Sequence, residues 1–80
     1  MSSLDDAVRV ASALREQKKY TEAIDLLQRA LAAAAPDDFH RLAANREGVR
    51  AAEEAGLPAV AKRFADAIAI RDEEGEDEEA

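Results

Sequence analysis

The chain has 80 residues, 48% of them apolar and many of those alanine, which is enough for one domain with a thin core. It has no cysteine, no apolar run near the roughly 18 residues of a membrane span and no apolar leader, so we expect a cytoplasmic protein without disulfides or cysteine-based zinc sites. The net charge of -7 belongs to residues 72–80, which carry seven acids and no base, because residues 1–71 are neutral overall. We therefore expect a neutral domain over 1–71 and a disordered acidic tail over 72–80, since the tail has nothing to bury.

The first half of the chain predicts two helices joined by a tight turn. Apolar residues recur at helical spacing over 4–18, and Ser3 is suited to cap the start of this helix. A second amphipathic helix is predicted over 22–35, with Thr21 as its N-cap and Pro36 ending it. Because only two or three residues separate the two helices, they must lie antiparallel as a hairpin.

The second half predicts another hairpin. A third helix is expected over 38–55, with Asp37 as its cap, and Gly56 suits the left-handed residue that ends a helix. Pro58 suits the first turn of a fourth helix, which should fray near Asp72. The expected core consists of the residues on the apolar faces of these helices: Leu4, Ala7, Val8, Ala11, Leu14, Ala23, Ile24, Leu27, Ala30, Leu31, Ala34, Phe39, Leu42, Ala43, Val49, Ala52, Leu57, Val60, Ala61, Phe64, Ala67 and Ile68.

An internal repeat relates the second and fourth helices. Sliding residues 18–31 onto 55–68, a shift of 37 residues, superimposes their apolar positions and pairs Leu27 with Phe64. A period near 34 residues is typical of tetratricopeptide repeats, in which helical pairs stack.

The first hairpin resembles the tetratricopeptide family at four positions: the small mid-helix residue Ala11, the aromatic Tyr20 near the turn, and the second-helix alanines Ala23 and Ala30. Lys18 replaces the usual glycine between the helices, and the second hairpin matches the pattern at Gly48 and Ala67. The resemblance implies an all-α, right-handed stack of two antiparallel hairpins, four helices in total. It also implies a non-enzymatic adaptor or scaffold that binds a partner peptide or helix.

A second resemblance competes with this one. The segment KYTEAI, residues 19–24, is similar to the region between the first two helices of an MIT domain, a helical module of about the same length that binds a partner tail. An MIT domain has three helices, whereas the Gly56-Leu57-Pro58 break predicts four. The tetratricopeptide interpretation is therefore preferred.

In the tetratricopeptide family, the first helix of each hairpin lines the binding groove. The resemblance then implies partner-binding residues on the first and third helices: Val8, Ser12, Arg15, Asn45, Arg46, Val49 and Arg50. Val8 and Ser12 occupy the places of the Lys and Asn of the family's carboxylate clamp, so we do not expect that clamp. Arginines favour an acidic peptide through bidentate contacts; the alternative is that they are ordinary surface charges.

Other functions have little support in the sequence. His40 is the only histidine and is expected to be an exposed first-turn residue, so we predict no metal site, no cofactor and no enzymatic activity. A neutral body with three aromatic residues at expected core positions does not favour nucleic-acid or membrane binding. Because two repeats are few for a stable stack, self-association is a structural alternative, with a second copy covering Val10, Leu26 and Ile70.

Overall fold

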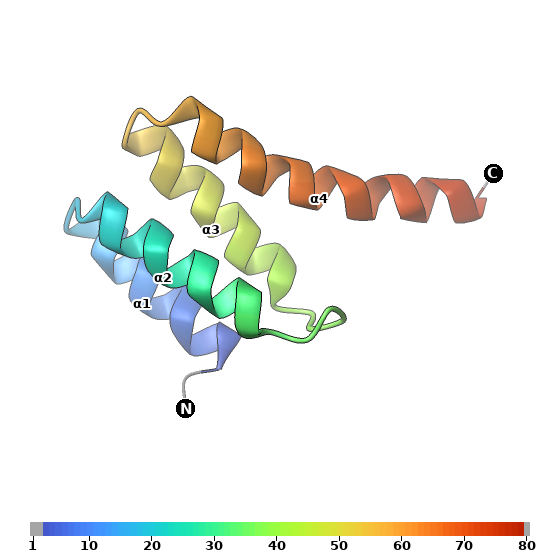
Figure 1. Cartoon of the computed structure of the whole chain (residues 1–80), viewed down its shortest axis with the longest axis horizontal. Coiled ribbons are helices and arrows are strands. Elements are labelled where there is room, and N and C mark those ends of the chain that lie inside the picture. Colours follow the sequence, from blue (N-terminus) through green and yellow to red (C-terminus); the bar gives the residue numbers. More distant parts are fainter. Residues whose placement is uncertain (1–2, 80) are drawn as a thin grey trace.

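A computed structural model describes the backbone of residues 3–79 and the side chains of residues 3–68. The described part contains four helices and no strand: α1 (Leu4–Glu16), α2 (Tyr20–Ala33), α3 (Arg41–Glu54) and α4 (Pro58–Glu79). Figure 1 shows them as two antiparallel hairpins, α1 with α2 and α3 with α4. The all-α class and the four helices predicted from the sequence are confirmed.

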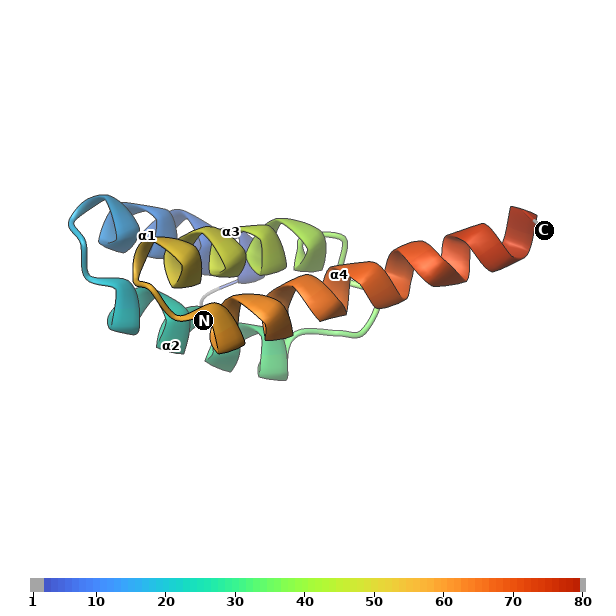
Figure 2. The same cartoon turned by 90° about the horizontal axis from the view of Figure 1, so that it is seen from above.

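The third helix is the centre of the arrangement. Helix α3 contacts α1, α2 and α4, and α1 contacts α2, whereas α4 touches only α3 among the described residues. In Figure 2, α1 and α3 form one layer, α2 and the first half of α4 form the other, and the second half of α4 extends beyond the bundle. None of the described helices is both long and apolar enough to cross a bilayer.

Both hairpins turn in the same way, by a Schellman motif. Lys18, with φ 65°, and Gly56, with φ 73°, take the left-handed conformation two residues after the ends of α1 and α3. Their amides donate to Arg15 O and Glu53 O, and the amides of the next residues, Lys19 and Leu57, reach back to Leu14 O and Ala52 O. The prediction for Gly56 is confirmed, and Lys18 has the same conformation in the first hairpin in spite of its side chain.

The predicted start of α1 is confirmed, because the Ser3 hydroxyl accepts a hydrogen bond from the Asp6 amide at 3.1 Å. The prediction that Thr21 caps α2 is wrong: the helix begins at Tyr20, and Lys19 stands at the cap without a side-chain bond. The turn after Lys18 is so tight that the chain is already helical at Thr21.

The predicted start of α3 at residue 38, with Asp37 as cap, is also wrong, because the helix begins at Arg41 with His40 at the cap position. The Asp38 carboxylate accepts a hydrogen bond from the His40 amide at 2.9 Å, and the Arg41 amide donates to Asp38 O at 3.1 Å. A short polar side chain that bonds to backbone two residues on favours a turn over a helix.

The residues at the start of α3 lie outside the core. Phe39 is 83% exposed, Leu42 37%, and Ala43 is also exposed, so their prediction as core residues is wrong. Leu57, at the second turn, is 40% exposed and was likewise predicted to be in the core. The buried apolar residues come from all four helices: Leu4, Ala7, Ala11, Ala23, Ile24, Leu27, Ala44, Ala51, Ala52, Ala61 and Phe64.

The buried positions repeat with the predicted spacing. Ala11 and Gly48 are both buried, as are Leu27 and Phe64, and each pair is 37 residues apart. The left-handed turn residues, Lys18 and Gly56, are instead 38 apart. A Cβ atom added to Gly48 would lie 2.5 Å from the Phe64 ring, so this glycine allows α4 to approach α3.

The end of α4 differs from the sequence prediction. The helix is traced through Glu79 rather than ending near Asp72, and Ala80 and the side chains of residues 69–80, Ile70 among them, lie outside the described part. Glutamate has a good helix propensity, and extending an existing helix is cheaper than starting one. The predicted disorder of residues 72–80 is therefore not confirmed.

Candidate protein-interaction face

Helices α1 and α3 lie side by side and run in the same direction (Figure 1). Charged groups link them at both ends. Near the start of each helix, Asp5 Oδ1 lies 3.9 Å from His40 Nε2. Near the end of α1, Arg15 reaches Glu47 in the middle of α3 at 2.5 Å and Glu54 at its end at 3.0 Å. These links fix the relative position of the two helices that were predicted to form the partner-binding groove.

Arg15 forms the stronger of the two links. Its side chain is only 17% exposed and that of Glu47 7%, so this pair is largely removed from water. The hydrogen bond to Glu47 raises the pKa of Arg15, and the charges of Glu47 and Glu54 add to this effect against the opposing effect of desolvation. The predicted site residue Arg15 therefore joins α1 to α3, and its guanidinium is already bound to two carboxylates.

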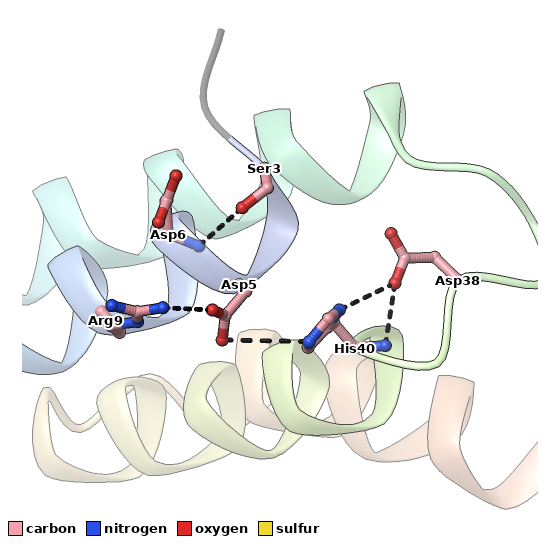
Figure 3. Close-up of polar contacts among 6 residues, drawn as sticks. All are labelled: Ser3, Asp5, Asp6, Arg9, Asp38 and His40. Atoms are coloured by element: carbon pink, nitrogen blue, oxygen red, sulfur yellow. Dashed lines mark hydrogen bonds and ion pairs between the residues drawn. The ribbon is translucent and has the colours of Figure 1, made fainter.

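Asp5 is the centre of the second link (Figure 3). Its carboxylate pairs with Arg9 one turn along α1 and faces His40, whose other ring nitrogen lies 3.2 Å from Asp38 Oδ1. The hydrogen bond from Arg9 lowers the pKa of Asp5, and the charges of Arg9 and His40 add to this effect against the opposing effect of desolvation.

His40 thus has a more specific place than the exposed first-turn residue expected from the sequence. Its side chain is 34% exposed and lies between two carboxylates, and its ring centroid is 4.1 Å from that of Phe39. The described residues contain no group of three or more side chains arranged to hold a metal ion. His40 therefore takes part in a polar contact between helix ends.

The other predicted site residues differ in how far a partner can reach them. Asn45 is buried, with 5% of its surface exposed, and Val8 and Val49 pack partly against the core. Ser12 is half-buried, whereas Arg46 and Arg50 are exposed. No ion pair or hydrogen bond found among the described side chains involves Arg46 or Arg50, which lie one turn apart on α3. They are the predicted residues best placed to contact a partner.

Arg41, at the start of α3, shows that another arginine of this helix is structural. Its guanidinium donates to the Leu31 carbonyl in the last turn of α2 at 3.0 Å. A helix leaves its last four carbonyls without an intrahelical partner, and this bond satisfies one of them. Arg41 therefore joins the first hairpin to the second and is less suited to contact a partner.

The sequence did not predict a groove between α3 and α4 at their connecting turn. It has a volume of about 500 Å³ and is lined by Val49, Glu53, Gly56, Leu57, Pro58, Ala61, Lys62 and Ala65. Leu57 was assigned to the core by its spacing with the apolar residues of the fourth helix, but it lies in the turn before α4 and is 40% exposed. Helical spacing does not distinguish an exposed leucine from a buried one, so no signal in the sequence indicated this groove.

Comparisons of the chain with models of protein families, with curated proteins and with solved structures find no match. The tetratricopeptide and MIT resemblances therefore stay interpretations of the sequence.

Proposed function

We propose that this chain is a non-enzymatic protein-interaction module of the tetratricopeptide type, which binds a partner peptide or helix across the face formed by α1 and α3. The observation that carries the proposal is the parallel, side-by-side placement of these two helices, each followed by an antiparallel partner. Stacked hairpins of this type place their first helices side by side in the same way. The four helices also favour this proposal over the three-helix MIT alternative.

The charges on this face favour an acidic partner. Arg9 and Arg15 are paired with carboxylates of the chain itself, whereas Arg46 and Arg50 are exposed and one helical turn apart. Two guanidinium groups at this spacing suit carboxylates on neighbouring turns of a partner helix or on an extended acidic segment. Ser12 and the exposed edge of Val49 are expected to contribute polar and apolar contacts around them.

A peptide titration followed by NMR tests the proposal. We expect an acidic amphipathic peptide to shift the amide resonances of α1 and α3, and a basic peptide of the same length to leave them unchanged. Arg46→Glu combined with Arg50→Glu should weaken binding at least about tenfold, as expected when two charged contacts are reversed.

The matched control is Arg29→Glu combined with Arg63→Glu, which reverses two arginines on α2 and α4. This control should leave the affinity nearly unchanged after correction for net charge. Shifts confined to α2 and α4, or equal weakening by both double variants, would contradict the proposal.

A further inference from the structure

The groove between α3 and α4 is an apolar surface with opposite charges on its two walls. Its floor is formed by Val49, Leu57 and Ala61, with Leu57 40% exposed. The acid Glu53 lines it from α3 and the base Lys62 lines it from α4. Both charged residues are exposed, and both lie within about two turns of the connection at Gly56.

This charge pattern is self-complementary. Residues 53 and 62 lie at similar distances from the turn, measured along the helix axes. At a rise of 1.5 Å per residue, these two distances differ by a few ångströms. A two-fold axis parallel to the hairpin places α3 of one copy opposite α4 of the other. The same rotation places Glu53 of each copy opposite Lys62 of the other copy. The interface therefore contains two equivalent Glu53–Lys62 pairs, as an isologous interface requires.

We propose that the chain forms a symmetric homodimer through this groove, with the apolar floors in contact and two reciprocal Glu53–Lys62 pairs at the edges. The apolar contact of Val49, Leu57 and Ala61 supplies most of the affinity, and the charge pairs set the register, because exposed ion pairs contribute little on their own. Lys62 already pairs with Asp66 one turn along α4, at 2.9 Å, and this exposed contact costs little to exchange.

The site differs from the residues that the sequence suggested for self-association. Val10 is 50% exposed on α1, but Leu26 already packs partly against the core, and the side chain of Ile70 lies outside the described part. The groove lining shares Val49 with the proposed partner-binding face but does not include Arg46 or Arg50. The dimer and the proposed partner binding can therefore be tested separately.

Charge-swap variants test the dimer in the full chain, with the mass of the particles measured by sedimentation equilibrium from micromolar to millimolar concentration. Glu53→Lys alone and Lys62→Glu alone each place like charges opposite one another, and each should weaken the dimer roughly tenfold or more. An equimolar mixture of the two variants restores both pairs, as does the double variant Glu53→Lys with Lys62→Glu. Both should dimerise about as well as the native chain.

A second pair of variants tests the apolar floor. Leu57→Gln should raise the dissociation constant of the dimer at least about tenfold, whereas Val10→Gln, an equally polar change at an exposed residue of α1, should leave it unchanged. Circular dichroism checks that every variant is folded. A native chain that is monomeric at every concentration would overturn the proposal. A dimer whose affinity is unchanged by each single charge swap would also overturn it, as would a dimer that Val10→Gln weakens as much as Leu57→Gln does.

Discussion

The packing of the Phe64 ring of α4 against α3 depends on the absence of a side chain at Gly48. The buried Phe64 ring occupies the space in which a Cβ would lie, 2.5 Å away. In an exposed helix, glycine to alanine stabilises by about 1 kcal/mol. Here the same change forces apart two packed helices, and overpacking costs about 1–3 kcal/mol.

We therefore expect Gly48→Ala to lower the free energy of unfolding by about 1 kcal/mol, the opposite sign to that of an exposed site. Urea denaturation followed by circular dichroism measures the change. Repeating it in a Phe64→Leu background separates the two effects, because the smaller side chain leaves room for the methyl group and the added alanine should then cost less. Equal costs in both backgrounds would show that Phe64 is not the cause.

Among the ion pairs of the described side chains, that of Arg15 and Glu47 is the most protected from water. Removing one partner leaves the other charge almost buried, which is costlier than the loss of an exposed pair. We expect Arg15→Ala to lower the free energy of unfolding by about 2 kcal/mol, less than the 3–5 kcal/mol of a fully buried pair, because Arg15 keeps some exposure. Thermal and urea unfolding provide the measurement.

Two further variants make the test of Arg15 specific. In the double variant Arg15→Met with Glu47→Leu no charge is left unpaired, so most of the stability should return. Arg9→Ala removes an exposed pair within α1 and should cost far less. A double variant that is no more stable than Arg15→Ala would count against the ion-pair explanation.

The lowered pKa of Asp5 predicts that the stability of the chain depends on pH. Its folded-state pKa lies below the ordinary value, so its contribution to stability is present above that value and is lost as the pH falls through the lowered pKa. Asp5→Asn should therefore lower the melting temperature slightly at neutral pH, and the difference from the native chain should shrink below about pH 4. Asp25→Asn is the control, because it removes the exposed ion pair of Asp25 with Arg29 within α2 and so measures the effect of losing any one exposed carboxylate. A difference that is constant from neutral to acid pH would contradict this role.

At the scale of the helices, the two hairpin turns offer a matched comparison. Lys18 takes the left-handed conformation at φ 65°, which costs about 1–2 kcal/mol for a residue with a Cβ, and Gly56 takes it at φ 73° without that cost. Lys18→Gly should therefore raise the free energy of unfolding by about 0.5–1 kcal/mol after the extra flexibility of glycine in the unfolded chain is subtracted.

The controls for Lys18→Gly lie in the same two turns. Lys19→Gly, at φ -93°, should destabilise, and Gly56→Ala should destabilise through its backbone alone, because no atom lies within 4 Å of the added Cβ. Chemical denaturation of the three variants measures the signs. A loss of stability in Lys18→Gly would mean that the lysine side chain itself contributes to the turn.

The sequence predicted the ends of the helices well where the signal is a single residue that acts within its own turn. Ser3, Gly56 and Pro58 each act within their own turn, so a start, an end and a restart were predicted correctly. The start of α3 was not, because Asp37 looked like a cap in the sequence, whereas the hydrogen bond from the His40 amide to Asp38 forms a turn and the helix begins only at Arg41.

The candidate site was predicted less well, for a physical reason. The exposure of Arg15 depends on Glu47, which is 32 residues away, and Leu57 is exposed in the turn between α3 and α4 although its spacing matches that of the core residues. Helical spacing indicates which residues share a face, but it does not indicate which face a neighbouring helix covers. Arg46 and Arg50 are exposed on α3, and their assignment to a partner-binding groove stays a prediction.

At the scale of the molecule, α3 unites the two hairpins through its contacts with all three other helices. We expect one cooperative unfolding transition, since a core this small is marginal and neither hairpin buries its apolar face alone. Fluorescence of Tyr20, the only tyrosine, reports on the first hairpin, and circular dichroism reports on all helices. Their urea transitions should coincide in the native chain and in Gly48→Ala, although that change lies in the second hairpin. A Tyr20 transition unaffected by Gly48→Ala would show that the hairpins unfold separately.

The one-residue difference between the spacing of the buried pairs, 37, and that of the turn residues, 38, restricts how the hairpins can be recombined. Consider a chimera in which α1 is joined to α4 so that Lys18 takes the place of Gly56. The core positions of one helix would then be out of register by one residue, and its buried face would be rotated by about 100°. A chimera joined at matching core residues keeps that face in phase but changes the length of the turn. The two halves of this chain are therefore similar in plan without being exchangeable parts.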